Sequence, residues 1–214
     1  MITTDIYDFN AVRNHIIFKL IPFQSNMEKL KTLPHRSFID LVLCYQILET
    51  DSDDSSQKYT TPVTWDLLSA WKITEEELYV AASRNTPASL PARLHDMDSL
   101  ILKLSQSMDL EENKLPLPSP HQPMYVLTNQ YGFLGAACIA YSNLLERLCT
   151  HFNSSYYILP CSIHETILIP CSDDSHLNEL SEMVRDINQT VLDKKDILSD
   201  HAYFYDRRFG LCRA

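Results

Sequence analysis

Met124-Tyr-Val-Leu-Thr-Asn129 is a short apolar run that opens the segment that decides the fold. Its aromatic, β-branched and aliphatic side chains favour a strand. It is followed by an amphipathic run over residues 132–152, two adjacent apolar strands over 156–170, a second amphipathic run over 176–191 and an aromatic strand over 200–206. The order β-α-β-β-α-β predicts the split βαβ, or ferredoxin-like, layout, in which helices cover one face of a mostly antiparallel sheet. We therefore expect an α+β fold.

The two amphipathic runs carry apolar side chains at helical spacing, and we expect these side chains to form core, because a half-buried helix needs such a stripe. The first stripe contains Leu134, Cys138, Tyr141, Leu145, Leu148, Cys149 and Phe152, and the second contains Leu177, Leu180, Val184, Ile187 and Val191.

The first half of the chain predicts a second set of strands and helices. Thr74 and Glu77 form a capping-box pattern that starts a helix, and the Asn85-Thr-Pro87 string ends it, since a residue before proline is pushed out of helical space. The other expected elements are strands over 15–21, 38–48 and 58–63, with a polar loop over 51–56, and helices over 26–33, 65–71 and 96–107. We thus expect two α/β sandwich-like halves.

The clearest internal boundary is Leu115-Pro-Leu-Pro-Ser-Pro-His-Gln-Pro123. Its prolines favour an extended segment and remove backbone donors from any sheet. We therefore predict an N-terminal α+β half over residues 1–110, a proline-rich linker over 111–123 and a C-terminal half over 124–214.

Composition limits the classes of partner. The 214 residues include 28 acidic and 18 basic side chains, for a formal charge of −10, which is opposite to the charge that phosphate contacts need. No apolar stretch approaches the length of a membrane span, and the N-terminus is acidic where a signal peptide is basic. Six cysteines form no Cys-x-x-Cys pair. We expect a soluble cytoplasmic protein with no nucleic-acid or membrane partner, no metal and no cofactor, and with reduced thiols.

Two pairs of polar residues are candidates for chemistry: His164 with Glu165, and Asp200 with His201. Histidines and carboxylates are the usual metal ligands and acid-base groups. Neighbours on a strand point to opposite faces, so if both pairs lie in strands, at most one member of each can face a common site. This favours structural roles, and a metal-dependent or acid-base hydrolase is the alternative.

A second candidate is the junction between the strand at 124–129 and the run that follows it, where Asn129, Gly132 and Gly135 lie. Free amides at such a junction suit a small anion, and an anion sensor is one alternative function. Equally, Asn129 can begin a turn and Gly135 can let a helix lie close to the sheet. A third observation is that His201, Tyr203 and Tyr205 share one face of the last strand, where an exposed tyrosine row would suit a partner protein.

Several short strings, in this order along the chain, resemble a known bacterial family. They are Leu33-Pro-His-Arg-Ser-Phe-Ile-Asp-Leu41, Trp71-Lys-Ile-Thr-Glu-Glu-Glu-Leu-Tyr79, Asn85-Thr-Pro87, Met124-Tyr-Val-Leu-Thr-Asn129, Ser162-Ile-His-Glu165 and Leu198-Ser-Asp-His-Ala-Tyr-Phe-Tyr-Asp206. The family is domain of unknown function 5688, found mainly in gut Firmicutes, with domain of unknown function 1444 more distantly similar. The resemblance covers about residues 16–206 and implies membership, not an activity. Because members usually carry a further N-terminal region, we expect a short or N-terminally truncated member.

No catalytic motif of high specificity accompanies this fold, and one layout hosts many functions. The interpretation that we favour is a non-enzymatic binding or protein-interaction module, with an unknown protein as a conceivable partner.

Overall fold

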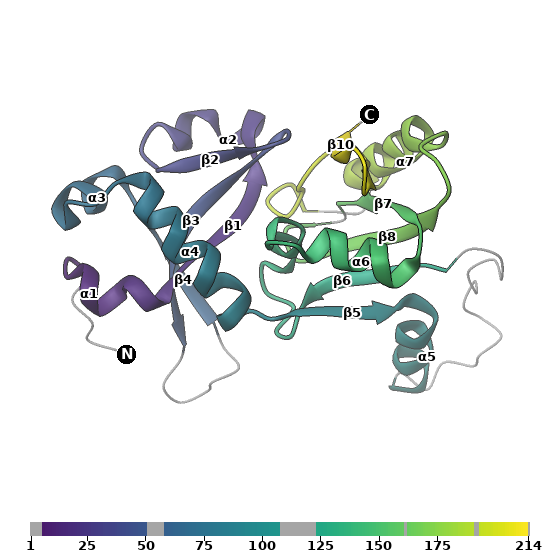
Figure 1. Ribbon diagram of the computed structural model, residues 1–214, viewed down its shortest axis with the longest axis horizontal. Coiled ribbons are helices and arrows are strands. Elements are labelled where there is room, and N and C mark those ends of the chain that lie inside the picture. The colour runs from purple at the N-terminus through teal and green to yellow at the C-terminus, as the bar shows by residue number, and fades with distance from the viewer. Residues whose placement is uncertain (1–5, 51–57, 108–122, 161, 191–192, 214) are drawn as a thin grey trace.

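Two antiparallel sheets make up the protein in the computed structural model (Figure 1). The structure describes residues 6–50, 58–107, 123–160, 162–190 and 193–213. The predicted polar loop at 51–56, residues 111–122 of the predicted linker, and Cys161 lie outside the described residues. The mixed helical and antiparallel architecture confirms the expected α+β class. None of the described helices is both long and apolar enough to cross a membrane.

The first sheet is built around its longest strand, β3 (Leu41–Thr50). Strand β1 (Ile16–Pro22) pairs along one side of it. Strands β2 (His35–Phe38) and β4 (Lys58–Pro62) follow one another along the other side. The strand predicted over 38–48 is therefore two strands, because Ile39 and Asp40 form a tight turn between β2 and β3. The helices of this half are α1 (Phe9–Val12), η1 (Arg13–His15), α2 (Phe23–Leu30), α3 (Trp65–Trp71) and α4 (Glu75–Ser89).

Helix α4 begins where its sequence predicts and ends later. The capping box is present, with Thr74 accepting from the Glu77 amide and Glu77 accepting from the Thr74 amide. The predicted end at Asn85 and Pro87 was wrong, since the helix continues to Ser89 with Pro87 inside its last turn. Tertiary hydrogen bonds hold this turn in place: Asn85 donates to the Ile16 carbonyl, and the Phe18 amide donates to the Thr86 hydroxyl. These bonds cover the free edge of β1.

The second sheet has the strand order β10-β9-β7-β8-β6-β5. Its chain order from β6 onward confirms the predicted β-α-β-β-α-β. The hairpin strands β7 and β8 take the central places between β9 and β6. The bounds are β5 (Ala92–Asp96), α5 (Met97–Ser107), β6 (Tyr125–Asn129), η3 (Gly135–Ala140), α6 (Leu144–Phe152), β7 (Ser155–Leu159), β8 (Thr166–Cys171), α7 (Leu177–Thr190), β9 (Tyr203–Asp206) and β10 (Gly210–Arg213).

Helices α6 and α7 cover opposite faces of the second sheet, so the expectation of helices on one face was wrong. Leu145 and Leu148 of α6 share a core with Tyr156 and Ile158 of β7, whereas α7 packs in a different core with the alternate β7 residue Tyr157. Strand order explains this. The crossovers β6-α6-β7 and β8-α7-β9 both run toward the β10 edge of the sheet. The strands from which they start, β6 and β8, are antiparallel to one another. Right-handed crossovers of this kind must use opposite faces.

The amphipathic run predicted over 132–152 is two helices rather than one. Asn143, between η3 and α6, has a left-handed backbone with φ of 59°, which interrupts the helix. The predicted stripe is nevertheless buried, including Cys138, Leu145 and Leu148. Helix periodicity therefore identified most of the core side chains of this run although the helix that carries them is broken, and Phe152 is only partly buried. In the second predicted stripe, Ile187 is 43% exposed, so its assignment to the core was wrong.

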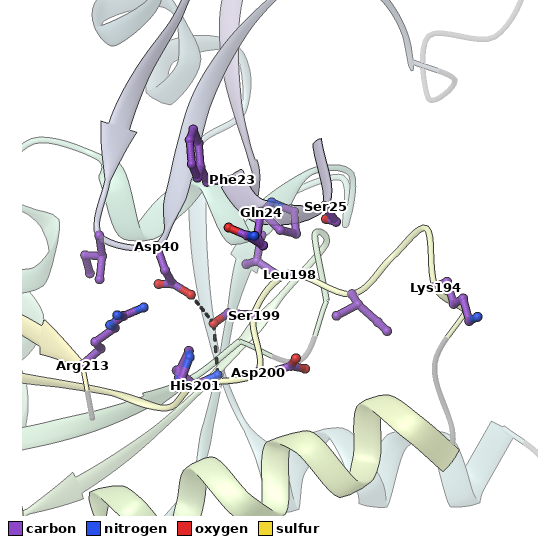
Figure 2. Close-up of a pocket in the computed structure, with 13 residues that line it drawn as sticks. Phe23, Gln24, Ser25, Asp40, Lys194, Leu198, Ser199, Asp200, His201 and Arg213 are labelled. Carbon is purple, nitrogen blue, oxygen red and sulfur yellow. Dashed lines mark hydrogen bonds between the residues drawn. The ribbon is translucent and has the colours of Figure 1, made fainter. Parts of the chain in front are cut away.

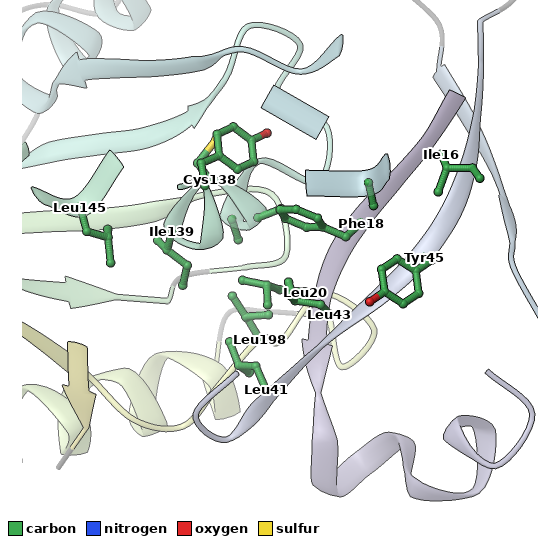
Figure 3. Packing of buried hydrophobic residues seen from close by; sticks show 14 of the residues in the cluster. Ile16, Phe18, Leu20, Leu41, Leu43, Tyr45, Cys138, Ile139, Leu145 and Leu198 are labelled. Atoms are coloured by element: carbon green, nitrogen blue, oxygen red, sulfur yellow. The ribbon is translucent and has the colours of Figure 1, made fainter. Parts of the chain in front are cut away.

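One hydrophobic core joins the two sheets (Figure 3). Phe18 and Leu20 of β1 pack in the same cluster as Cys138 and Ile139 of η3. Strand β5 precedes the proline-rich segment in the chain, yet it pairs with β6, so the chain passes from one sheet to the other between α4 and β5. Whether residues 1–110 and 124–214 behave as two separate halves stays a prediction.

The C-terminal part of the second sheet differs from the predicted strand over 200–206. Strand β9 begins only at Tyr203, and β10 follows it as an edge strand that the sequence analysis did not predict. Tyr203 is fully buried and Tyr205 partly buried in the shared core. These tyrosines therefore do not form an exposed row that could bind a partner protein, because this face of β9 packs inward.

Candidate functional site

A cavity of about 960 Å³ lies where the two sheets meet (Figure 2). The first half supplies residues from the start of α2 and from the β2–β3 turn. The second half supplies the segment before β9 and the end of β10. The lining residues are Pro22, Phe23, Gln24, Ser25, Ile39, Asp40, Lys194, Ile197, Leu198, Ser199, Asp200, His201 and Arg213.

Asp40 forms hydrogen bonds that link the two walls of this cavity. Its Oδ1 accepts a hydrogen bond of 2.9 Å from the hydroxyl of Tyr203, and its Oδ2 accepts one of 2.7 Å from the hydroxyl of Ser199. The Ser199 hydroxyl in turn accepts from the backbone amide of His201 at 3.0 Å. Figure 2 shows the chain of contacts from Asp40 through Ser199 to the His201 backbone. The network fixes the β2–β3 turn against the segment that leads into β9.

Tyr203 stays a hydrogen-bond donor in this network. Burial is the main cause that raises the pKa of its phenol, and the negative charge of Asp40 raises it further. Arg213, its cross-strand neighbour on β10, lowers the pKa by a smaller amount. The phenol is therefore protonated at neutral pH, as its contact with the Asp40 carboxylate requires.

Ile39 has a left-handed backbone, with φ of 59°, at the turn beside Asp40. This conformation is strained for a β-branched residue, and strain of this kind clusters at functional sites. The Ile39 side chain is also 39% exposed and lines the cavity. The turn therefore presents an apolar side chain and a carboxylate to the same space.

The structure places the predicted residues Asp200 and His201 in this cavity, just before β9. Asn188 of α7 donates to Asp200 Oδ1 at 2.8 Å and to the Ser199 carbonyl at 2.9 Å. These bonds hold the segment against α7.

His164 and Glu165 lie elsewhere, in the turn between β7 and β8. Nδ1 of His164 accepts from the Leu134 amide at 3.2 Å, and its Nε2 lies 3.9 Å from Asp196 Oδ1. Glu165 is exposed. Neither residue lines the cavity that contains Asp200 and His201. Within the described ranges, no group of three or more His, Cys, Asp or Glu side chains is arranged to hold a metal ion.

The premise that both pairs lie in strands was wrong. Strand β8 begins at Thr166 and β9 at Tyr203, so each pair precedes its strand. The two pairs are separated because the β7–β8 turn packs on the start of η3, whereas the segment before β9 packs on α7 and Asp40.

The junction after β6 is closely packed. The Asn129 amide group donates to the Phe133 carbonyl, and its oxygen accepts from the Tyr131 amide. A Cβ on Gly135 would fall on the Thr128 hydroxyl and the His164 carbonyl. Gly132 adopts a left-handed backbone with φ of 63°. Here the helix approaches the sheet so closely that only glycine fits.

Three residues of the cavity, Asp40, Ser199 and Arg213, were not predicted as site residues. Asp40 and Ser199 lie 159 positions apart, and no local pattern links them. A signal for Asp40 was the Ser37-Phe-Ile-Asp40 string, where an acid follows an apolar pair at a tight turn. Arg213 lies at the end of β10, a strand that was not predicted.

No curated protein and no solved structure matches this chain. A family model does match, over residues 1–207 of 214, and its description is a family of unknown function, DUF5688. This match agrees with the resemblance carried by the short strings, and the chain belongs to that family.

Proposed function

We propose that the protein is a non-enzymatic binding module whose ligand lies in the cavity between the two sheets. The observation that carries this proposal is the cavity itself, at about 960 Å³ and with walls from both halves of the chain. Sites for small molecules usually measure about 300 to 1,000 Å³ and combine apolar walls with a few polar groups. Phe23 and Ile39 supply apolar surface, and His201 and Arg213 supply polar groups.

The contacts of Ser199 favour binding over catalysis. A serine nucleophile needs a base that takes its proton, usually a histidine that is itself oriented by a third group. The hydroxyl of Ser199 is buried, it points to the Asp40 carboxylate, and it accepts from the His201 backbone rather than its ring. Ser199 therefore acts as a brace between the two walls.

The hydrolase alternative would need His164 and Glu165 to act with Asp200 and His201. The two pairs lie in different surroundings, and His164 is engaged by the Leu134 amide and faces Asp196. The sensor alternative would need free amides near Asn129. The Leu134 and Ala136 amides have protein acceptors, His164 Nδ1 and the Ile163 carbonyl. Both alternatives receive less support than the cavity.

The net charge of −10 fits a ligand other than nucleic acid. A cytoplasmic location fits the described cysteines, since Cys44, Cys138, Cys149, Cys171 and Cys212 are all free thiols.

Binding of the fluorescent probe 1-anilinonaphthalene-8-sulfonate to the native protein tests the proposal. Ser25 lines the cavity from α2 and is exposed, so Ser25→Trp should place an indole ring in the cavity and obstruct it without disturbing the core. Ser69→Trp, on the exposed surface of α3, is the matched control. We expect a saturable fluorescence signal that Ser25→Trp removes and Ser69→Trp keeps. A folded Ser25→Trp protein that binds the probe like the unmodified protein would refute the proposal.

A further inference from the structure

We propose that the ligand of the inter-sheet cavity is a small organic monocarboxylate, with its carboxylate beside Arg213 and His201 and its apolar body along Phe23 and Ile39. This inference rests on the proposed binding function and adds the chemical class of the ligand. It is carried by the hydrogen-bonding groups of the cavity wall, because acceptors and donors differ in how far the protein itself satisfies them.

The carboxylates of the wall accept hydrogen bonds from protein donors. Asp40 receives the hydroxyls of Tyr203 and Ser199 on its two oxygens. Asp200 accepts from the side-chain amide of Asn188 on Oδ1, and its Oδ2 has no donor among the described residues. A cationic ligand would therefore have to compete with two protein donors at Asp40 and with one at Asp200.

The donors of the wall are different. Among the residues that the structure describes, the side chains of Lys194, His201 and Arg213 have no hydrogen bond or ion pair to a protein group. The guanidinium of Arg213 is always charged, and an imidazole carries at least one N–H in either protonation state. These three side chains have no protein acceptor among the described residues, and a ligand carboxylate supplies one in charge-assisted form.

Two of these donors lie at one end of the cavity. Arg213 of β10 lies opposite Tyr203 of β9, and residues opposite one another on an antiparallel pair share a face. His201 lies in the bend that leads into β9 and lines the same cavity. Figure 2 shows Arg213 and His201 at the end of the cavity near Asp40, with Lys194 at the other end. The carboxylate therefore fits at the Arg213 end.

The rest of the cavity suits an apolar body. Phe23 and Ile39 are 43% and 39% exposed and both line this cavity, so they give it apolar surface. The Tyr203 and Ser199 hydroxyls are turned toward Asp40. A ligand with a single charged end and a hydrocarbon body matches this division.

Three probes of equal chain length test the class: octanoate, octan-1-ol and octylammonium, each titrated into the full-length protein by calorimetry. We expect octanoate to bind at least about tenfold more tightly than the alcohol, and the ammonium more weakly than either. Arg213→Gln should weaken octanoate about tenfold and leave octan-1-ol nearly unchanged. Arg207→Gln is the control, since Arg207 is exposed and contacts Thr150 outside this cavity.

The outcomes separate the two claims. If all three probes bind alike and Ser25→Trp abolishes them, the cavity is a binding site but the monocarboxylate class is wrong. If octanoate binding survives Ser25→Trp, the cavity is not the site and both claims fail. An equal loss of octanoate affinity in Arg207→Gln and Arg213→Gln would also overturn the assigned carboxylate position.

Discussion

The hydroxyl of Tyr203 donates to Oδ1 of Asp40 at 2.9 Å across the boundary between the two sheets. The pair lies 163 positions apart in the chain, and Tyr203 is fully buried. Because Asp40 also accepts from Ser199, one carboxylate of the first half forms hydrogen bonds with two residues of the second half. These two bonds hold the walls of the cavity together.

Removing Asp40 should cost more stability than removing the Tyr203 hydroxyl. Tyr203→Phe deletes one hydrogen bond and should cost about 1 kcal/mol, whereas Asp40→Ala leaves two buried hydroxyls without an acceptor and should cost about 2 to 4 kcal/mol. Urea unfolding of the two variants measures the difference. Equal losses in both variants would show that the Ser199 contact contributes nothing.

Unfolding of the whole chain should be a single transition. The core that contains Phe18 and Leu20 of the first sheet also contains Cys138 and Ile139 of the second half, so neither sheet keeps its packing when the other unfolds. Calorimetry, with fluorescence and circular dichroism as separate probes, should give one coincident transition. Two resolved transitions would show that the two sheets unfold independently of one another.

The two glycines after β6 should respond differently to alanine. A Cβ on Gly135 would collide with the Thr128 hydroxyl and the His164 carbonyl. It would also lie 2.9 Å from the backbone nitrogen of Asn129. Gly135→Ala should therefore cost about 3 kcal/mol, as an overpacked core does. Gly132 has open space around its Cβ position and only a positive φ, so Gly132→Ala should cost about 1 kcal/mol. Denaturant unfolding measures the loss of stability in each variant. A larger loss in Gly132→Ala than in Gly135→Ala would contradict the close packing at Gly135.

Sequence patterns predicted the local features best. The Thr74 capping box depends on residues three apart, and helix α3 matches its predicted bounds. The end of α4 was missed because contacts from Asn85 and Thr86 to β1 outweigh the effect of Pro87. Long-range pairing decides such contacts, and a single sequence does not display it.

The candidate site was predicted in part. Asp200 and His201 stood out by residue type, and both line the cavity. Asp40 and Arg213 enter it through a tight turn and an edge strand, neither of which has a periodic signature. The strand order that puts α6 and α7 on opposite faces was likewise invisible, since chain order alone does not determine spatial order.

Thiol reactivity should follow burial. Burial raises the pKa of Cys44 to about 11 and that of Cys138 to about 12, so few thiolates form at neutral pH and access is blocked. Cys212 is exposed near the C-terminus and should react first. Timed alkylation of the native protein followed by peptide mass spectrometry measures the order. Early labelling of Cys138 would show that η3 is not packed between the sheets.

The central claim is that the inter-sheet cavity binds a ligand, and amide chemical shifts report it most directly. Titration of the ¹⁵N-labelled protein with octanoate should move the amide signals of Gln24, Ser25, Ile39 and His201 most. Signals from β5, at the far edge of the second sheet, should stay in place. Saturable shifts confined to the cavity residues are the predicted result, and shifts that are absent there or centred on another surface would contradict the account.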